Sequence, residues 1–489
     1  MTIRRRIGTC ALLAAALLMT AATSSLAENS AAAPYDQSFV TQHTGVFGNE
    51  TLSYTATVES TVLTDDSGKP AANFVSTSYE LNGVKDPGKR PVIFAYAGGP
   101  SGASTAYHSY LLGPKRIVDP EPGRAGAGRT VIDNPDWLLD IADIVMVDPA
   151  ETGFSRILPD GKRDYFYNIN GDTASIEQFI GRWLKKHHRE ASPLYVMGGS
   201  YGSVRSIRIA WDLRKTAHPV AGFFITANCA MLQETTPPFP IGFATALPSQ
   251  EMTAIYHHKV EHGPLSDKQL LDDAYDFATN EYLPALSRVQ DLTPAQRSAM
   301  ADKLSARTGI SADVYLANDL AITTKQYMDT LLQDRGLVIA TTNDGRATRP
   351  AGTPAREDLG ALDLFRAYMR DDLKVTYPMS DYRGEAPNTE NWGYDGPKDA
   401  KRWDGGNDWP KMVRETLGAD PKTRMLSFNG YYDNQCPYSE ARYLFSRTKL
   451  PKDQYEVHEY PGPHGLYMVP STASHITDDI RRTIKAQGY

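Results

Sequence analysis

The stretch from Gly198 to Gly202, which reads Gly-Gly-Ser-Tyr-Gly, constrains this chain more than any other feature. It follows the apolar run 193–197 and precedes residues 203–210, whose pattern is compatible with a helix. A strand, a tight turn and a helix in this order form a nucleophile elbow. Its two outer glycines let the turn tighten and expose the serine hydroxyl. Ser200 is therefore the candidate nucleophile.

A nucleophilic serine needs a general base and a group that orients the base, and two later loops supply them. Residues 424–430 read as a buried strand that breaks into a loop containing Asp433, the candidate acid. Residues 455–460 alternate like another strand and open into a turn-rich loop containing His464, the candidate base. Alone, Asp433 also fits an acid that caps its own loop, and His464 a surface histidine. Their joint placement after the last two strands favours a catalytic triad.

A second glycine-rich turn lies upstream of the elbow, where the apolar run 90–97 ends in Gly98 and Gly99. A strand that ends in two glycines exposes backbone N–H groups, as an oxyanion hole requires, although a plain strand-ending turn is the alternative. We expect the hole to use the N–H groups of Gly99 and Tyr201, with Gly98 beside the substrate. The loop 148–155, which follows the next strand, is expected to line the same pocket.

Five segments of the chain match one family pattern in order as well as in content. They read Ala-Gly-Gly-Pro-Ser, Val-Asp-Pro-Ala-Glu-Thr-Gly-Phe-Ser, Gly-Ser-Tyr-Gly, Gly-Tyr-Tyr-Asp and Pro-His, at residues 97–101, 147–155, 199–202, 430–433 and 463–464. Together they resemble the serine carboxypeptidase family of α/β-hydrolases, particularly its bacterial branch. The resemblance spans most of the chain and implies an enzyme that cleaves peptide bonds.

Two departures from the family pattern concern the substrate. The resemblance implies an Asn in the oxyanion loop and a Glu before the serine that bind the free carboxylate of a peptide. This chain has Ala97 and Gly199 at those places. Neither side chain can form a hydrogen bond. Because each lost charge-assisted hydrogen bond removes roughly 1.5–3 kcal/mol, we expect a weaker preference for a free carboxylate.

Two charged residues near the elbow have open roles. The elbow is also similar to that of the prolyl and tripeptidyl aminopeptidases, which hold the substrate's amine with acidic residues. Glu151 is an acid that binds such an amine, replaces the missing family Glu next to Gly199, or faces solvent. Arg205 lies more than one helical turn past the serine, so it is expected to pair structurally behind the site rather than bind a carboxylate.

The pattern of strands and helices predicts the domain organisation. Residues 53–58 and 73–79 read as an opening antiparallel pair, after which strands and helices alternate. Helix signals then replace strand signals over a long stretch. We therefore predict an α/β protein with the α/β-hydrolase fold: a mostly parallel central sheet and a helical cap inserted between the last core strands. The core comprises residues 28–229 and 421–489, and the cap comprises residues 230–420.

The N-terminal residues 1–27 predict a cleavable signal peptide. The segment has three arginines at 4–6, an apolar stretch at 10–22 and a small-residue cleavage site at 25–27. We expect export to the periplasm or the extracellular space and no membrane span. Removal of the three arginines changes the formal net charge from −7 to −10. An acidic protein of this kind is not expected to bind nucleic acid or an anionic membrane surface.

Removal of the signal peptide leaves two cysteines, Cys229 and Cys436, each of which follows a predicted core strand. If those strands are neighbours, both sulfurs lie at one edge of the sheet, and an oxidising compartment permits a disulfide between them. Two free buried thiols are the alternative. With so few cysteines and no clustered histidines, no metal site is expected. Acyl transfer by a catalytic triad requires no cofactor, so none is expected either.

These residues predict an exported serine hydrolase that acts on a peptide or a small acyl substrate through Ser200, His464 and Asp433. An esterase, an acyltransferase or an aminopeptidase-like hydrolase with the same triad is the alternative. A non-catalytic binding protein is a further one, although a complete triad with two glycine-rich loops argues against it.

Overall fold

The structure is a computed structural model that describes residues 34–119, 128–230, 239–354, 360–393 and 408–489. The predicted signal peptide, residues 1–27, lies outside the described residues. Within the described ranges, no helix has the length and apolar character needed to cross a membrane.

One large sheet has the strand order β1-β2-β3-β7-β4-β9-β10-β13-β14, with β8 beside β3. The strands from β7 to β14 in this order run parallel to one another. The first four are antiparallel neighbours. The bounds are β1 Phe39–Phe47, β2 Glu50–Thr64, β3 Pro70–Leu81, β4 Val92–Tyr96, β7 Asp143–Val147, β8 Arg156–Ile157, β9 Leu194–Ser200, β10 Val220–Asn228, β13 Arg424–Gly430 and β14 Tyr455–Tyr460.

The predicted opening antiparallel pair is confirmed, since β2 pairs with β3 along most of its length. The turn between them closes with a hydrogen bond from Gly68 N to Asp65 O of 2.9 Å. The edge strand β1 was not predicted. Every second residue of β1 is exposed, as expected of a strand with one face toward solvent.

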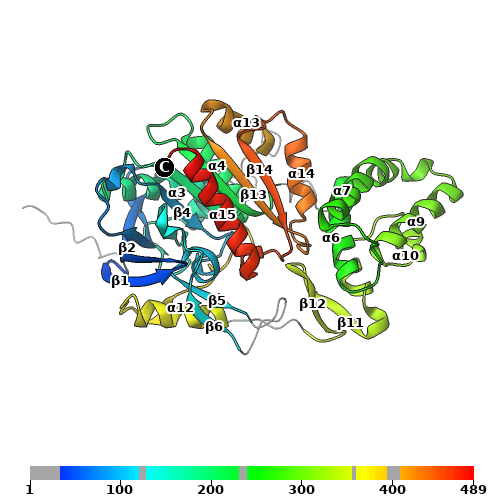
Figure 1. Cartoon of the computed structure of the whole chain (residues 1–489), viewed down its shortest axis with the longest axis horizontal. Helices are drawn as coiled ribbons and strands as arrows, with labels where there is room; N and C mark the ends of the chain where they lie inside the picture. The colour runs from blue at the N-terminus through cyan, green and yellow to red at the C-terminus, as the bar shows by residue number, and fades with distance from the viewer. Residues whose placement is uncertain (1–33, 120–127, 231–238, 355–359, 394–407) are drawn as a thin grey trace, which may run out of the picture. The chain divides into compact units, whose positions relative to one another are not determined.

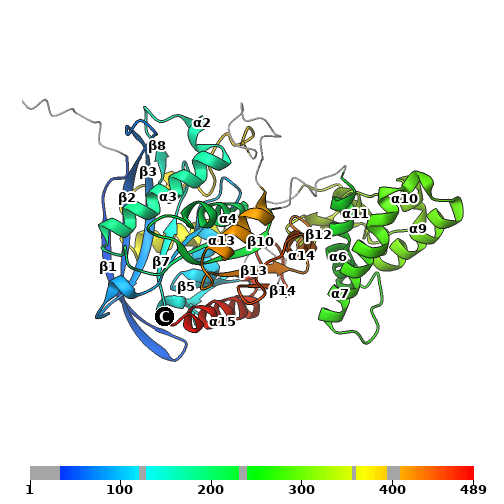
Figure 2. The same ribbon diagram turned by 90° about the horizontal axis from the view of Figure 1, so that it is seen from above.

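Helices cover both faces of the sheet because side chains of its central strands alternate between two apolar clusters. In β4, Val92 and Phe94 belong to one cluster and Ile93 to the other. Helices α3, α4, α13 and α14 pack into the first cluster, and α12 and α15 into the second. Figure 2 shows α4 beside α13. Their bounds are α3 Ile169–Lys186, α4 Tyr201–Leu213, α12 Gly360–Asp371, α13 Trp409–Ala419, α14 Tyr438–Ser446 and α15 Pro470–Ala486.

The long insertion lies between β10, which ends at Asn228, and β13, which begins at Arg424. Most of its buried apolar residues between Ala244 and Ile339 form a separate cluster. Figure 1 shows α6, α7, α9 and α10 grouped together in green. In contrast, α12 and α13 pack against the main sheet, so the predicted cap, 230–420, has two structurally different parts. The helices of the first part are α6 Pro240–Tyr256, α7 Asp267–Phe277, α8 Leu283–Ser287, α9 Pro294–Thr308, α10 Ala312–Ala317 and α11 Thr324–Thr330.

The insertion also contains an antiparallel hairpin that the sequence analysis did not predict. Strands β11 (Leu337–Thr341) and β12 (Asp344–Pro350) pair with each other. The remaining elements are the small sheet β5 (Lys115–Val118) with β6 (Thr130–Asp133) and the short helices α1 (Thr105–Tyr107) and α2 (Arg163–Phe166).

Candidate active site

The elbow forms at the carboxyl end of the central strand β9. Ser200 has φ 57° and ψ −128°, and α4 begins at the next residue. A non-glycine residue with positive φ is strained, and at a strand-to-helix turn this conformation presents the serine hydroxyl to solvent. A Cβ added at Gly198 would lie 2.3 Å from Gly202 O, so a side chain cannot be accommodated there. The sharp turn therefore depends on the glycines that first identified it.

The glycine-rich turn after β4 lies directly against the elbow. A Cβ at Gly98 would lie 2.3 Å from Gly199 O and 2.8 Å from Tyr201 N. Gly99 has φ 114°, a conformation that favours glycine. Gly98, Gly99, Ser200 and Tyr201 all line one cavity of about 1050 Å³. The two N–H groups predicted to form the oxyanion hole thus belong to residues at the same cavity wall as the serine.

The candidate acid and base contact each other in the loops that follow β13 and β14. His464 Nδ1 lies 2.8 Å from Asp433 Oδ2. The other carboxylate oxygen, Oδ1, accepts hydrogen bonds from the backbone N–H groups of Gln435 and Cys436, at 2.8 and 2.9 Å. Asp433 is fully buried. Asp433 therefore caps its own loop and also orients the imidazole. The two roles that the sequence left open for Asp433, loop cap and triad acid, are compatible.

Opposing effects act on the imidazole of His464. Burial alone would lower its pKa, but the charge of Asp433 and the hydrogen bond to it raise the pKa, and the balance lies above the usual 6.5. Because the buried carboxylate accepts a hydrogen bond from Nδ1–H, the lone pair of the neutral ring is on Nε2. This is the tautomer that a general base needs.

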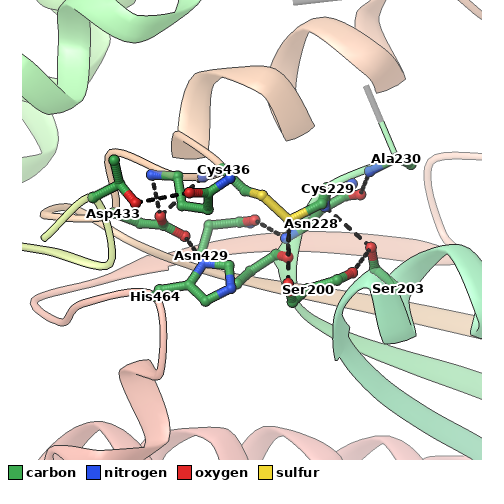
Figure 3. Close-up of a disulfide and its surroundings, with 12 residues drawn as sticks. Ser200, Ser203, Asn228, Cys229, Ala230, Asn429, Asp433, Cys436 and His464 are labelled. Carbon is green, nitrogen blue, oxygen red and sulfur yellow. Dashed lines mark hydrogen bonds and ion pairs between the residues drawn. A yellow bond between two sulfur atoms is a disulfide. The ribbon is translucent and has the colours of Figure 1, made fainter. Parts of the chain in front are cut away.

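Ser200 and His464 both line the cavity and both lie near the sulfur of Cys229. Ser200 Oγ is 3.8 Å from Cys229 Sγ. A ring nitrogen of His464 is within 4.8 Å of the same sulfur. Figure 3 shows the three side chains together. Among the described residues, Ser200 Oγ makes no hydrogen bond to the imidazole. In enzymes of this kind that bond often tightens only when substrate binds.

Cys229 and Cys436 form a disulfide with their Cα atoms 5.2 Å apart. Of the two alternatives expected from the sequence, a disulfide or two free thiols, the structure contains the disulfide. The pairing is possible because β10 and β13 are parallel neighbours. The bridge connects the serine and the acid: Cys229 N donates to Ser203 Oγ at 3.0 Å, and Ser203 Oγ donates to Ser200 O at 2.6 Å.

The hairpin of the insertion supports both loops of the acid and the base. Its tip accepts hydrogen bonds from His464 N at Asn343 O (2.6 Å) and from Asn434 N at Thr342 O (2.9 Å). These hairpin residues were not predicted from the sequence. The run 337–341, rich in branched apolar residues, followed by an Asn-Asp-Gly turn, is a hairpin signal that was available.

A neutral wall occupies the space beside Gly199. A Cβ there would lie 2.3 Å from Thr226 Oγ1 and 2.5 Å from the Tyr107 hydroxyl. These two groups hydrogen-bond to each other. Burial raises the pKa of Tyr107 well above its usual value, so its hydroxyl is neutral. No residue larger than glycine fits at 199 unless this pair moves.

Glu151 does not belong to the cavity wall among the described residues. One carboxylate oxygen accepts a hydrogen bond from Ile157 N at 2.8 Å, and the other pairs with Arg383. The suggestion that Glu151 binds substrate is therefore corrected to a structural role, because both of its oxygens already have partners.

Arg205 lies behind the oxyanion loop, as expected. Its guanidinium is fully buried and pairs with Asp172 at 2.7 Å. It also donates to Pro100 O at 2.6 Å and to Ala97 O. Arg205 thereby joins the elbow helix to both sides of the glycine-rich turn.

Residues 78–206 match the sequence model of the serine carboxypeptidase family. No curated protein sequence matches significantly. Among solved structures, the chain is similar to Kex1, a prohormone-processing carboxypeptidase from Saccharomyces cerevisiae. The identity is 12%, the TM-score 0.53, and the alignment covers 88% of this chain and 91% of that one.

Two further structures are more distant. The acetyl esterase MekB has 12% identity and a TM-score of 0.38, with 88% of this chain and 97% of that chain covered. Juvenile hormone epoxide hydrolase from the silkworm Bombyx mori has 11% identity and a TM-score of 0.36, with 89% and 79% covered.

The sheet order and the likeness to Kex1 define the class of protein: it has the α/β-hydrolase fold, as predicted. The family match covers the glycine-rich turn after β4 and the elbow. It confirms the predicted resemblance to the serine carboxypeptidase family over residues 78–206.

The raised pKa of His464 predicts the pH dependence of activity. The base must be neutral, so kcat/KM for an activated ester should fall as the pH drops through a midpoint above 6.5. Asp433→Asn removes the charge that raises this pKa, so the midpoint should move to lower pH. The kcat should fall by about 10⁴-fold because the imidazole loses its orienting partner. Asp453→Asn, an exposed acid, serves as the control. An unchanged midpoint in Asp433→Asn would contradict the assignment.

The buried pair of Arg205 predicts a large stability effect. Arg205→Leu leaves the carboxylate of Asp172 buried without its partner, which should lower the free energy of unfolding by about 3–5 kcal/mol. The matched control is Arg208→Leu on the same helix, whose pair with Asp212 is partly exposed and should contribute at most about 1 kcal/mol. Urea unfolding measures both. Equal losses in the two variants would show that burial of the pair is unimportant.

Proposed function

We propose that this protein is an exported serine hydrolase that cleaves peptide bonds through an acyl-enzyme on Ser200. The observation that carries the proposal is the hydrogen bond between His464 Nδ1 and the buried Asp433, placed at the same cavity as the elbow. An isolated histidine or serine would carry little weight. Three groups of a known catalytic set at the carboxyl ends of strands β9, β13 and β14 of one sheet are a specific arrangement.

The reaction follows from the positions of these groups. His464 Nε2 takes the proton from Ser200 Oγ as the oxygen attacks the substrate carbonyl. Asp433 holds the imidazole and stabilises its charged form. The N–H groups of Gly99 and Tyr201 bind the oxyanion of the tetrahedral intermediate. His464 then gives its proton to the leaving group, and water releases the acyl group by the same steps.

The wall beside Gly199 supports an altered preference for the leaving group. A free carboxylate would face the neutral pair Tyr107 and Thr226 and the methyl group of Ala97. Arg205 cannot help, because its guanidinium binds Asp172 and backbone carbonyls. We therefore propose that the family's carboxylate clamp is lost, and that amides and esters are accepted in place of free acids.

The location rests on the N-terminal segment. The basic, apolar and small-residue regions of residues 1–27 support export through a cleavable signal peptide. A disulfide between Cys229 and Cys436 suits an oxidising periplasmic or extracellular compartment.

Aminopeptidase-like activity is the second candidate, and Glu385 is the observation that favours it. This exposed carboxylate lines the cavity and is placed to attract a substrate ammonium group. Glu385 is a better candidate for binding an amine than Glu151, because both carboxylate oxygens of Glu151 already have partners.

One peptide series tests the proposed function. An N-blocked dipeptide is supplied to the mature protein as its free acid, amide and methyl ester, together with the unblocked peptide. The amide and the ester should be cleaved at least as fast as the free acid, since each lost charge-assisted contact removes roughly 1.5–3 kcal/mol of the preference for the acid. Ser200→Ala should abolish turnover, whereas Ser446→Ala, an exposed serine, should not.

Other results would redirect the proposal. A strict requirement for the free acid would mean that a clamp has been rebuilt elsewhere. Faster cleavage of the unblocked peptide would favour the aminopeptidase-like candidate. Equal, low activity of the wild type and Ser200→Ala would mean that the protein binds and does not catalyse.

A further inference from the structure

The disulfide lies against the proposed base, and this arrangement has a chemical consequence beyond stability. The sulfurs of Cys229 and Cys436 and one ring nitrogen of His464 all lie within 4.8 Å of one another. Figure 3 shows the sulfur–sulfur bond above the imidazole. Two sulfurs and an imidazole nitrogen are ligands that Zn²⁺ prefers, but a disulfide sulfur is not a metal ligand. Reduction of the bridge would therefore change what this cluster can bind.

We propose that the reduced protein holds a Zn²⁺ site formed by Cys229, Cys436 and His464, and that occupation of this site switches the hydrolase off. A dithiol reductant supplies two electrons and two protons, which convert the bridge into two thiols while the reductant becomes a disulfide. Zn²⁺ then displaces both thiol protons and binds two thiolates and the imidazole. The loss of activity rests on the proposed function, whereas the metal site does not.

The distances suit a tetrahedral site once the sulfurs separate. Zn–S bonds of about 2.3 Å and Zn–N bonds of about 2.0 Å place neighbouring ligand atoms about 3.5–3.8 Å apart. The three groups already lie within 4.8 Å. Breaking the bridge lets the sulfurs move from bonding distance to this spacing, with Cys229 after β10 and Cys436 on the loop before α14.

The hydrogen bond between His464 and Asp433 is also typical of a histidine that binds a metal. A zinc-bound histidine usually donates its other N–H to a carboxylate, which fixes the ring and increases its basicity. His464 Nδ1 already has this partner in the buried Asp433, so Nε2 is the nitrogen for the metal. Cys229 lines the cavity, which gives the ion a path. Ser200 Oγ, 3.8 Å from Cys229 Sγ, or water takes the fourth position.

The lone pair on His464 Nε2 cannot bind a metal ion and accept a proton at the same time. With Nε2 bound to Zn²⁺, His464 cannot accept the proton of Ser200, so hydrolysis stops. In the oxidised protein the sulfurs are occupied by their mutual bond, and the imidazole is free to act as the base. Reducing surroundings would break the disulfide and open the Zn²⁺ site, and bound zinc would then stop hydrolysis.

Cobalt tests the site without relying on activity. The mature Ser200→Ala protein is reduced with dithiothreitol, freed of reductant without oxygen and titrated with Co²⁺. We expect one equivalent to bind, with thiolate-to-cobalt charge-transfer absorption that one equivalent of Zn²⁺ abolishes. The oxidised protein and the reduced Cys229→Ser/Cys436→Ser protein should show no such absorption. Absence of the band in the folded, reduced protein would overturn the proposal.

The activity measurement uses the wild-type protein and an activated ester. One equivalent of Zn²⁺ should lower the activity of reduced protein at least tenfold, and a chelator followed by reoxidation should restore it. Zn²⁺ should not affect oxidised protein at the same concentration, and equal inhibition of both forms would contradict the site. Should the double serine variant fail to fold, protection of both thiols from iodoacetamide by Zn²⁺, read by mass spectrometry, decides the question. Unprotected thiols count against it.

Discussion

The close contact between the glycine-rich turns at the ends of β4 and β9 determines where the reactive serine stands. A Cβ at Gly98 would lie 2.7 Å from the Cβ of Ser200. The two turns can therefore approach this closely only because residue 98 has no side chain. Arg205 stabilises this contact. It lies on α4, which follows the elbow, and it donates hydrogen bonds to backbone carbonyls of the glycine-rich turn after β4. The sheet order then brings β13 and β14, with Asp433 and His464, to the same edge.

The insertion contacts the loops that carry the acid and the base. The backbone of its hairpin tip bonds to the loops of both the acid and the base, and Gly345 N donates to Tyr432 O at 2.8 Å. A small apolar cluster adds contacts between the two parts, with Met252 and Leu271 on the insertion side and Tyr431 and Tyr438 on the other. A movement of the hairpin would therefore displace the proposed catalytic groups as well as change access to them.

The sequence was sufficient where a candidate residue lies at or shortly after the end of a strand. Ser200, Asp433 and His464 each do so, and the carboxyl ends of parallel strands meet at one edge, so local pattern and general topology were enough to bring them together. The hairpin was missed because its short apolar run stood within a region dominated by helix signals. The role of Glu151 stayed open because its partner, Arg383, is 232 residues away, and such pairings leave no local trace. The pairing of Cys229 with Cys436 stayed open for the same reason, since it depends on which strands are neighbours.

The central claim is that Ser200 is a nucleophile activated by His464, and labelling with a fluorophosphonate probe tests it most directly. The folded, oxidised protein should gain the mass of one phosphonyl group on the peptide that contains Ser200. The labelling rate should fall strongly in His464→Ala and in protein unfolded by urea. Labelling at another residue, no labelling of folded protein, or an equal rate in His464→Ala would contradict the account.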